Sequence, residues 1–488
     1  MKRASEQDSS LKAVKTSESE KPNQSTPNEE EMGEFEDPYG DDFESEEEIF
    51  EAGEDGEPDK EDGDEMEEVS EEPQHTSRVF LPNRSAPLGD NEVMEPDYST
   101  YHMLHSVNVK WPCLSFDILP DNLGMSRKIY PQTMYIVAGS QADKAKDNEV
   151  SVLKFSSLAK TLIRDEDDDE DEDGDEDYDA DPVLESKSLP CYSTVNRLRV
   201  TPFASPTKEY LCASMMENGE VQLWDVSPQL RSIDTPGSNV SKQQNKPIFT
   251  IKAHGKVEGY AVDWSPLVSS GQLLTGDISG KIFLTSRTTG GWVTEAKPFS
   301  ASNGSVEDLQ WSPTEKTVFA AGGSDGHVRI WDARQSAKPA ISVKATNTDI
   351  NVMSWNHQAS HLLASGYDDG QFGVWDLRSF TSGKPVADFH FHKQAVTSIE
   401  WHPSDDSVLA VASEDNTVSL WDLSVEADDE EIAEQARQAK GDLDEIPSQL
   451  LFVHWQPNVK EVHWHKQIPG ALISTGSDGF SLWKTISI

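Results

Sequence analysis

One acidic stretch of the chain contains the spacing with which a loop of carboxylates holds calcium. Asp169, Asp171 and Asp173 alternate and are followed by Gly174, as in the first half of an EF-hand loop. The last position of such a loop needs a bidentate Glu, and here it is Ala180. Because 14 of the residues from 165 to 181 are acidic, partial matches arise by chance. We therefore predict no calcium site.

Histidines form the second group whose spacing suggests metal binding. His463 and His465 are two positions apart and would project from the same face of a strand. The other candidates are scattered along the chain: His254, His392, His402 and His454. The three cysteines form no CxxC pair or other metal spacing: Cys113, Cys191 and Cys212. We predict no metal and no cofactor.

The sequence lacks the common catalytic motifs. It contains no phosphate-binding Gly-Lys-Ser/Thr loop, no nucleophile elbow and no HExxH helix. Acids are abundant, but no pattern among them would give two carboxylates separate acid and base roles. We therefore predict that the protein is not an enzyme.

Negative charge is concentrated in a few stretches. The chain has 41 Lys+Arg and 89 Asp+Glu, a formal net charge of -48. Residues 1–75, 165–181 and 426–445 together carry -44 of this charge, so the rest of the chain is nearly neutral. Such a chain repels nucleic-acid phosphates, and its apolar runs are too short to cross a bilayer. We predict an intracellular protein that binds a strongly basic protein partner, without direct nucleic-acid or membrane contact.

An internal repeat predicts the elements that carry these residues. Three consecutive units each contain two tryptophans 20 residues apart, with an Asp six positions before the second. They are Trp311, Asp325 and Trp331; Trp355, Asp369 and Trp375; Trp401, Asp415 and Trp421. Looser copies begin near Trp111, Val200, Trp264 and Trp464. Short β-branched runs ending in Gly/Asp turns indicate small antiparallel sheets that must pack against their neighbours.

The Trp-Asp pairs that close several units resemble those of the WD-repeat family. They begin at Trp224, Trp331, Trp375 and Trp421. Leu284 and Trp483 occupy the same place without a following Asp. Seven units predict an all-β, seven-bladed WD-repeat β-propeller with a short N-terminal helix and a disordered acidic N-terminal tail. The resemblance also implies that His254 and His392 hydrogen-bond the turn Asp of their own blades, instead of a metal.

The last unit lacks an outer strand, because only residues 484–488 follow its second tryptophan. An uncovered sheet edge must be paired or protected. The β-prone segment 77–81 precedes the first blade, and we expect it to supply that strand and join the chain ends.

Composition divides the chain into a disordered acidic tail, residues 1–76, and a propeller, residues 77–488. Three insertions interrupt the propeller repeat: the acidic stretches 165–181 and 426–447, and the polar stretch 227–246. Long insertions in a compact domain are usually functional or disordered. Alanines and glutamates in 426–440 favour a short helix.

Candidate partner-binding residues lie in the insertions and at the expected rim of the channel. The acidic candidates are Asp165, Asp169, Asp173, Asp177, Asp181, Glu426, Asp428, Asp429, Glu430 and Glu431. The rim candidates stand four positions before the first tryptophan of a blade: Tyr260, Glu307, Asn351, Thr397 and Lys460, with Asn196 in the looser second unit. A helix from Tyr98 through Leu104 would form a second groove with the loop 426–431.

The entry into the first blade narrows the resemblance. Tyr98, Tyr101, Leu104 and Val107 are near helical spacing, and Lys110-Trp-Pro-Cys-Leu114 follows them. These features are similar to the N-terminal signature of the histone-binding WD-repeat family. The acidic tail and the acidic loop of the first blade most resemble its glutamate-rich WD-repeat branch.

This resemblance implies a nuclear and nucleolar ribosome biogenesis factor. Its client would be large-subunit ribosomal protein three, kept soluble until it joins the pre-60S particle and its assembly factors; histone binding is a second implied activity. We expect a monomer whose acidic segments attract basic chains at long range. The residues leave the preferred client open, because histone tails and ribosomal extensions look alike to an acidic surface.

A different class of function is also open. Trp331-Asp-Ala-Arg334 and Trp375-Asp-Leu-Arg378 are WDxR boxes in adjacent blades, and they resemble those of substrate receptors for cullin-type ubiquitin ligases. Arg334 and Arg378 would then contact a ligase adaptor. The simpler interpretation, which we prefer, is that both arginines pair with surface acids.

Overall fold

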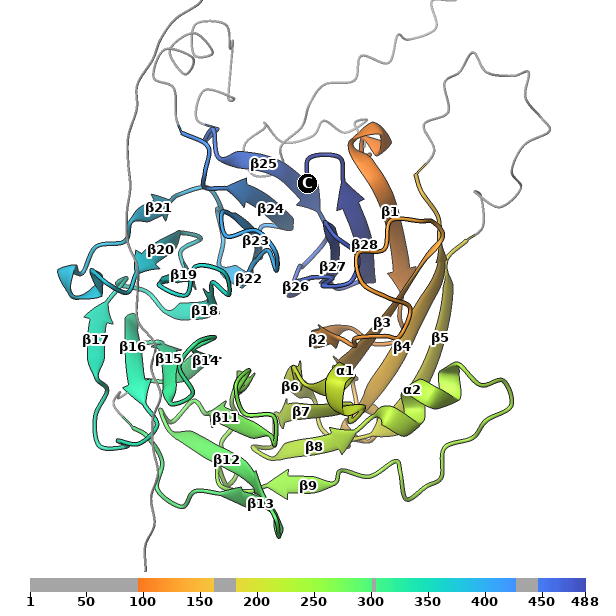
Figure 1. The fold of residues 1–488 in the computed structure, drawn as a ribbon, viewed down its shortest axis with the longest axis horizontal. Helices are drawn as coiled ribbons and strands as arrows, with labels where there is room; N and C mark the ends of the chain where they lie inside the picture. Colours follow the sequence, from red (N-terminus) through yellow and green to blue (C-terminus); the bar gives the residue numbers. More distant parts are fainter. Residues whose placement is uncertain (1–94, 162–180, 301–303, 427–445) are drawn as a thin grey trace, which may run out of the picture. The chain divides into compact units, whose positions relative to one another are not determined.

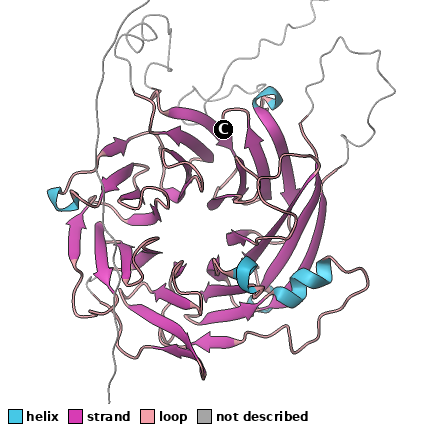
Figure 2. Cartoon of the chain, in the orientation of Figure 1, coloured by secondary structure: helices cyan, strands magenta, loops and turns pink. Residues whose placement is uncertain are grey.

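The computed structural model describes residues 95–161, 181–300, 304–426 and 446–488. The chain divides into the units Met1–Thr76 and Ser77–Ile488, and all described residues belong to the second. They form seven four-stranded antiparallel sheets arranged around a central channel (Figures 1 and 2). The predicted seven-bladed β-propeller is confirmed. The predicted tail lies outside the described residues.

The blades are numbered along the chain, and their strands run from the channel outward. Blade 1 contains β2 (Cys113–Ile118), β3 (Gln132–Ser140), β4 (Glu149–Leu158) and β5 (Val183–Pro190). Blade 2 contains β6 (Val195–Val200), β7 (Leu211–Met216), β8 (Val221–Asp225) and β9 (Phe249–Ile251). Blade 3 contains β10 (Ala261–Trp264), β11 (Gln272–Gly276), β12 (Ile282–Thr288) and β13 (Gly291–Thr294). Blade 4 contains β14 (Val306–Trp311), β15 (Val318–Gly323), β16 (His327–Asp332) and β17 (Ile341–Lys344).

The remaining blades continue the same order. Blade 5 contains β18 (Ile350–Trp355), β19 (Leu362–Tyr367), β20 (Phe372–Asp376) and β21 (Ala387–Phe389). Blade 6 contains β22 (Val396–Trp401), β23 (Val408–Ser413), β24 (Thr417–Asp422) and β25 (Leu450–Trp455). Blade 7 contains β26 (Glu461–Trp464), β27 (Ala471–Thr475), β28 (Gly479–Thr485) and, as its outer strand, β1 (Tyr101–Asn108).

The ring is closed by β1, and this corrects the prediction for residues 77–81. Those residues lie outside the described part, and the free edge of β28 is taken by β1, with Leu104 opposite Trp483. The expected helix from Tyr98 is one 3-10 turn, η1 (Tyr98–Thr100), and the chain continues as strand. The alternating burial of Tyr101, Met103 and Val107 fits a strand against an apolar sheet.

Buried aromatic and aliphatic side chains fill the spaces between neighbouring blades. One cluster joins Leu274 of blade 3 to Trp311 and Phe319 of blade 4. The second tryptophans of the repeat are fully buried: Trp224, Trp331, Trp375, Trp421 and Trp483. Each sheet therefore gains its core only by contact with the next sheet, which explains why the repeat must close into a ring.

Carboxylates on the innermost strands bond each blade to the next. An oxygen of each accepts a backbone N–H from the following blade, which satisfies a donor that faces the channel. The pairs are Asp117 with Val200 (2.7 Å), Asp263 with Trp311 (2.6 Å), Asp308 with Met353 (2.7 Å), Glu400 with Trp464 (3.1 Å) and Glu461 with Phe116 (2.8 Å).

Short helices are confined to the connections. They are η2 (Ala145–Asp147), α1 (Ala204–Thr207), α2 (Ser227–Ile233) and η3 (Phe380–Ser382). The polar insertion 227–246 begins with α2, whose Leu230 and Ile233 are buried in the cluster between blades 1 and 2. Its Asp234 accepts a hydrogen bond from Tyr135 at 2.8 Å. The first part of this insertion therefore packs on blade 1.

Candidate protein-binding site

The two ends of the propeller are formed by different connections. At one end, the second strand of each blade turns into the third, and the outer strand leads to the next blade; the other two connections lie at the opposite end, because the strands are antiparallel. The predicted rim residues lie at the first of these ends. Tyr260 and Lys460 directly precede β10 and β26, whereas Glu307, Asn351 and Thr397 are the second residues of β14, β18 and β22.

Three of these five residues make contacts within the propeller. The Asn351 amide donates to the Val396 carbonyl at 3.2 Å, and the Thr397 hydroxyl donates to the Val459 carbonyl at 3.3 Å. Lys460 Nζ lies 3.1 Å from Glu414. Asn196, from the looser unit, repeats the pattern by donating to the Gly259 carbonyl at 3.3 Å. These side chains therefore help to hold adjacent blades together.

Tyr260 and Glu307 instead belong to a group of acids that we call the acidic arc. Its members are Glu217, Glu258, Glu307, Asp349 and Asp368, on blades 2 to 5, together with Tyr260. Burial raises the pKa of Tyr260, and Glu258, Glu307 and Glu217 raise it further. Burial and Asp349 raise the pKa of Glu307. The pKa of Asp349 is raised by burial and then by Asp368. The arc therefore concentrates like charges at the rim.

Sequence reasoning missed four members of the arc: Glu217, Glu258, Asp349 and Asp368. They precede an inner strand or lie in the turn between the second and third strands of a blade. The available signal was their position within the repeat, one to three residues from a rim residue or beside the turn glycine. A cation meeting this surface gains from several carboxylates at once, since their mutual repulsion falls when it binds.

A buried charge cluster at the junction of blades 7, 1 and 2 has the opposite character. We call it the clasp. Glu461 is fully buried, and its carboxylate lies 2.8 Å from a guanidinium nitrogen of both Arg197 and Arg199. It also accepts hydrogen bonds from the Ser115 hydroxyl at 2.9 Å and the Phe116 N–H at 2.8 Å. One carboxylate thus bonds the last blade to the first two.

The ionisation of the clasp follows from these contacts. Burial favours the neutral acid, but Arg199, His463 and Arg197 hold the pKa of Glu461 well below its ordinary value. Burial likewise opposes a charged His463, but Glu400, 2.8 Å away, and then Glu461 raise its pKa to about 9. At neutral pH two carboxylates therefore face two guanidinium groups and an imidazolium, so the buried charge is compensated.

Comparison with known proteins assigns the chain to a family. The signature of the histone-binding protein RBBP4 and its counterpart in the CAF1 complex matches residues 91–159, and that described as "Vps8 beta-propeller" matches residues 313–428. The chain is 48% identical to "Ribosome assembly protein rrb1" of Schizosaccharomyces pombe over 94% of both chains. It is 44% identical to "Glutamate-rich WD repeat-containing protein 1" of Dictyostelium discoideum, over 82% of this chain and 83% of the relative.

The chain belongs to the family of glutamate-rich WD repeat-containing proteins. A third relative, "Protein HEAT STRESS TOLERANT DWD 1" of Arabidopsis thaliana, is 45% identical over 85% of this chain and 92% of its own. The predicted resemblance to the glutamate-rich WD-repeat branch is confirmed.

In this glutamate-rich WD-repeat protein, most acidic insertion residues predicted to bind a partner lie outside the described residues. Asp181 and Glu426 are described and exposed at the margins of those insertions. The expected helix in 426–440 falls almost entirely outside the described part. Tyr98 is 53% exposed, whereas Leu104 packs against the cluster between blades 6 and 7. The proposed groove between them and 426–431 therefore stays a prediction.

The arginines of the two WDxR boxes pair with the aspartates of the same boxes. Arg334 lies 2.5 Å from Asp332, and Arg378 lies 2.5 Å from Asp376. Arg334 and Arg378 are exposed, at the end of the propeller opposite the acidic arc. The preferred interpretation, pairing with surface acids, agrees with this geometry.

His254 and His392 occupy the structural positions that the WD-repeat resemblance implied. His254 Nδ1 lies 2.8 Å from Asp277 and its Nε2 lies 2.8 Å from Thr275. His392 Nδ1 lies 3.1 Å from Asp415, the turn Asp of its blade. Among the described residues, no group of three or more His, Cys, Asp or Glu side chains is placed to hold a metal ion.

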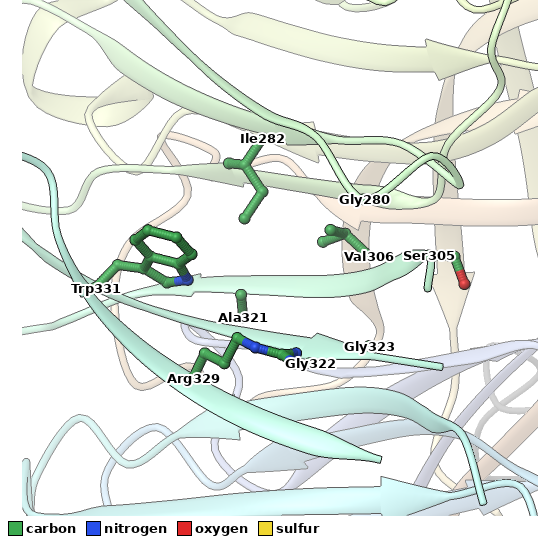
Figure 3. A pocket seen from close by; sticks show the side chains of 9 residues that line it. All are labelled: Gly280, Ile282, Ser305, Val306, Ala321, Gly322, Gly323, Arg329 and Trp331. Atoms are coloured by element: carbon green, nitrogen blue, oxygen red, sulfur yellow. The ribbon is translucent and has the colours of Figure 1, made fainter. Parts of the chain in front are cut away.

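One small pocket lies between blades 3 and 4 (Figure 3). It is lined by Gly280, Ile282, Ser305, Val306, Ala321, Gly322, Gly323, Arg329 and Trp331. Its free space for the centre of a water-sized sphere is about 10 Å³, roughly what one water needs. Metabolite sites are far larger, so this pocket provides no small-molecule site. No helix of the described residues is long and apolar enough to cross a membrane.

Proposed function

We propose that this protein is a non-enzymatic ribosome biogenesis factor that binds a basic ribosomal protein, large-subunit ribosomal protein three, and keeps it soluble before 60S assembly. The site of action would be the nucleus and nucleolus. A relative named as a ribosome assembly protein, matching over nearly the whole chain, supports the ribosomal role. The observation that carries the binding mechanism is the acidic arc on the rigid propeller.

The proposed mechanism separates capture from selection. The stretches 1–75, 165–181 and 426–445 attract a basic chain and raise its association rate. The arc then places carboxylates at fixed positions around Tyr260, whose ring offers an apolar surface and a hydroxyl. Release follows when ribosomal RNA, with its denser negative charge, competes for the same lysines and arginines.

Charge-neutralising variants test the role of the arc. Glu258→Gln, Asp349→Asn and Asp368→Asn together remove three carboxylates and keep their shape. The matched control, Glu295→Gln, Glu315→Gln and Asp406→Asn, removes three exposed carboxylates that lie away from the arc. Calorimetric titration with purified large-subunit ribosomal protein three should give about tenfold weaker binding for the arc variant at physiological ionic strength. The control should change affinity less than about twofold.

Equal affinity losses in the two variants would mean that only net charge matters, and the arc would then have no special role. A further variant that lacks residues 1–75 separates capture from selection. It should associate more slowly and lose salt dependence, and should still discriminate between basic clients. Loss of discrimination would place selection in the deleted segment.

Histone binding is the second candidate, because residues 91–159 match the histone-binding signature. A competition experiment ranks the two clients. Equal amounts of histone H3–H4 and large-subunit ribosomal protein three are offered to limiting protein at physiological salt. Preferential recovery of the histones would reject the ribosomal client as the main partner.

A further inference from the structure

A cationic surface lies where the ring closes, at the end of the propeller opposite the acidic arc. Lys128 is in the connection between β2 and β3, Lys160 follows β4, and Lys484 is near the end of β28. Figure 1 shows β1 and β28 beside the strands of blade 1. The three ammonium groups are near one another: Lys128 lowers the pKa of Lys484, after burial, and Lys484 and Lys160 both act on His102 of β1 in the same way.

These lysines lack paired acids among the described residues, although the chain is rich in acids. Within the described ranges, none of the three has a carboxylate at ion-pair distance, whereas Lys154 and Lys460 do. Repulsion among like charges costs stability. With 89 Asp+Glu in the chain, such a cluster of cations is a feature that a binding function would explain.

Large apolar side chains are exposed in the same segments. Ile129, next to Lys128, is 87% exposed, and Met125 of the same connection is 69% exposed. Ile486, two residues after Lys484, is 55% exposed, and its N–H donates to the carbonyl of Thr100 at the start of β1. Apolar side chains gathered beside charges on a folded surface mark interaction sites.

The connection that carries Lys128 and Ile129 is held in one shape. The Arg127 guanidinium donates to both oxygens of Asp121 at 2.7 Å and to the Thr133 carbonyl at 2.9 Å. Gln467 of blade 7 accepts from the Asp121 N–H at 2.8 Å and donates to the Gly124 carbonyl at 3.2 Å. A surface held in place in the free protein loses little entropy on binding.

We infer that this surface, formed by Lys128, Lys160, Lys484, Met125, Ile129 and Ile486, binds an acidic segment of a partner protein whose carboxylates alternate with large apolar side chains. Charge complementarity requires an anion, and the apolar side chains favour a peptide over a nucleic acid, whose phosphates offer them no contact. A long polyanion would also meet the chain's net charge of -48. Because the acidic arc lies at the other end, a basic client and an acidic partner can be held together.

The test uses the full-length protein and a fluorescent peptide of twelve residues in which Asp or Glu alternates with Phe or Leu. The first variant is Lys128→Glu with Lys160→Glu. The matched control, Lys316→Glu with Lys338→Glu, makes the same charge change on exposed lysines at the same end of blade 4. Fluorescence anisotropy should show saturable binding that is about tenfold weaker in the first variant and within about twofold of the unmodified protein in the control.

Two further variants distinguish the contributions. Ile129→Ser should weaken the peptide about threefold to tenfold without changing its salt dependence. Lys128→Gln with Lys160→Gln provides the same test without added negative charge. No saturable peptide binding, or equal losses in the lysine variant and the control, would overturn the inference. A preference for a twenty-nucleotide RNA over the peptide, lost in the lysine variant, would also overturn it and assign the surface to phosphate.

Discussion

The clasp and the acidic arc are neighbouring groups of channel carboxylates with opposite electrostatic surroundings. In the clasp, Arg197, Arg199 and His463 compensate Glu461 and Glu400, and the pKa values of both acids are lowered. In the arc, Glu307 and Asp349 face other carboxylates, and their pKa values are raised. Arg197 lies between the two groups: its guanidinium bonds Glu461 and donates to the carbonyl of Tyr260.

This difference separates carboxylates that stabilise the ring from carboxylates that a partner can use. A compensated buried acid is an internal bond, and removing it leaves buried cations without a partner. An uncompensated acid costs stability in the free protein, and that cost is recovered when a cation binds. The same substitution should therefore have opposite effects in the two groups.

The largest effect is expected at the centre of the clasp. Glu461→Gln keeps the size of the side chain but leaves Arg197 and Arg199 facing an uncharged amide. We expect the free energy of unfolding to fall by about 3–5 kcal/mol, as for other buried ion pairs that lose one member. Chemical denaturation measures this change. Glu315→Gln, the same exchange at an exposed site, should change stability by less than about 0.5 kcal/mol. A loss below about 1 kcal/mol at Glu461 would contradict the clasp's role in closure.

The second effect is a pH dependence that arises from His463. Its pKa in the folded protein is about 9, above the ordinary value of about 6.5. The folded chain therefore binds the proton more tightly, and this stabilisation is complete below pH ~6.5 and is lost as the pH rises through ~9. Between these values we expect stability relative to His463→Gln to fall by on the order of 2 kcal/mol. The lowered pKa values of Glu400 and Glu461 act at the acidic end, where their contribution is lost as the pH falls below ~4.5.

Denaturation at pH 6, 7, 8 and 9 provides the measurement. His402→Gln serves as the comparison, because that side chain packs edge-on against Trp464 and its pKa is lowered, first by burial. The His402 variant should show no loss of relative stability over the same range. Parallel pH profiles for unmodified protein and His463→Gln would show that Glu400 and Glu461 do not hold the proton.

The repeat could be predicted because its signals are local. Two tryptophans 20 residues apart and a turn Asp mark a blade wherever they occur, and blades 4, 5 and 6 follow this pattern without a gap. The turns also follow from local chemistry: Gly370 has a φ of +84°, and a Cβ there would lie 2.6 Å from the His392 carbonyl.

The closing strand and the clasp depend on contacts between distant parts of the chain. In 98–107, aromatic and aliphatic residues fit a helical spacing and a strand alternation equally well, and the free edge of β28 decides between them. Glu461 and Arg197 are 264 positions apart, so no local pattern joins them. The arc was found in part, through Tyr260 and Glu307, because the repeat predicts one rim position per blade and gives no guide to acids in the adjoining turns.

A third prediction extends the comparison from acids to a hydrogen-bond donor. In blades 2 and 5, Ser214 and Ser365 accept the indole N–H of the tryptophan ten residues later, both at 2.9 Å. Blade 4 has the same register but carries Ala321 at this position, and the Trp331 N–H has no acceptor within the described residues. Ala321→Ser should raise the free energy of unfolding by about 1 kcal/mol.

Calorimetry measures this gain as a rise of roughly 1–2 °C in Tm. Ala320→Ser is the matched control, because Ala320 is fully buried in the apolar cluster between blades 4 and 5. A hydroxyl there should lower stability by about 1–3 kcal/mol. If both variants lost stability, the Trp331 N–H would already have a partner such as a bound water.

The smallest effect is expected in the arc, and its sign is the decisive feature. The pKa of Glu307 is raised above its ordinary value, so the folded chain holds that proton more tightly and stability falls as the pH rises through the interval. Glu307→Gln removes this repulsion and can still accept the hydrogen bond from Ser305. At pH 7 we expect a gain of ~0.5 kcal/mol, the scale of a partly exposed charge, which disappears below pH ~4.

Glu400→Gln completes the comparison, because it makes the same exchange on an inner strand where the carboxylate is paired with His463. That variant should lose stability at pH 7, and Glu307→Gln should gain it while binding the basic client more weakly. Denaturation and client titration on the same two samples therefore test both halves of the distinction. If Glu307→Gln lost stability as Glu400→Gln does, Glu307 would be an internal bond of the ring, and the arc would have to be redefined without it.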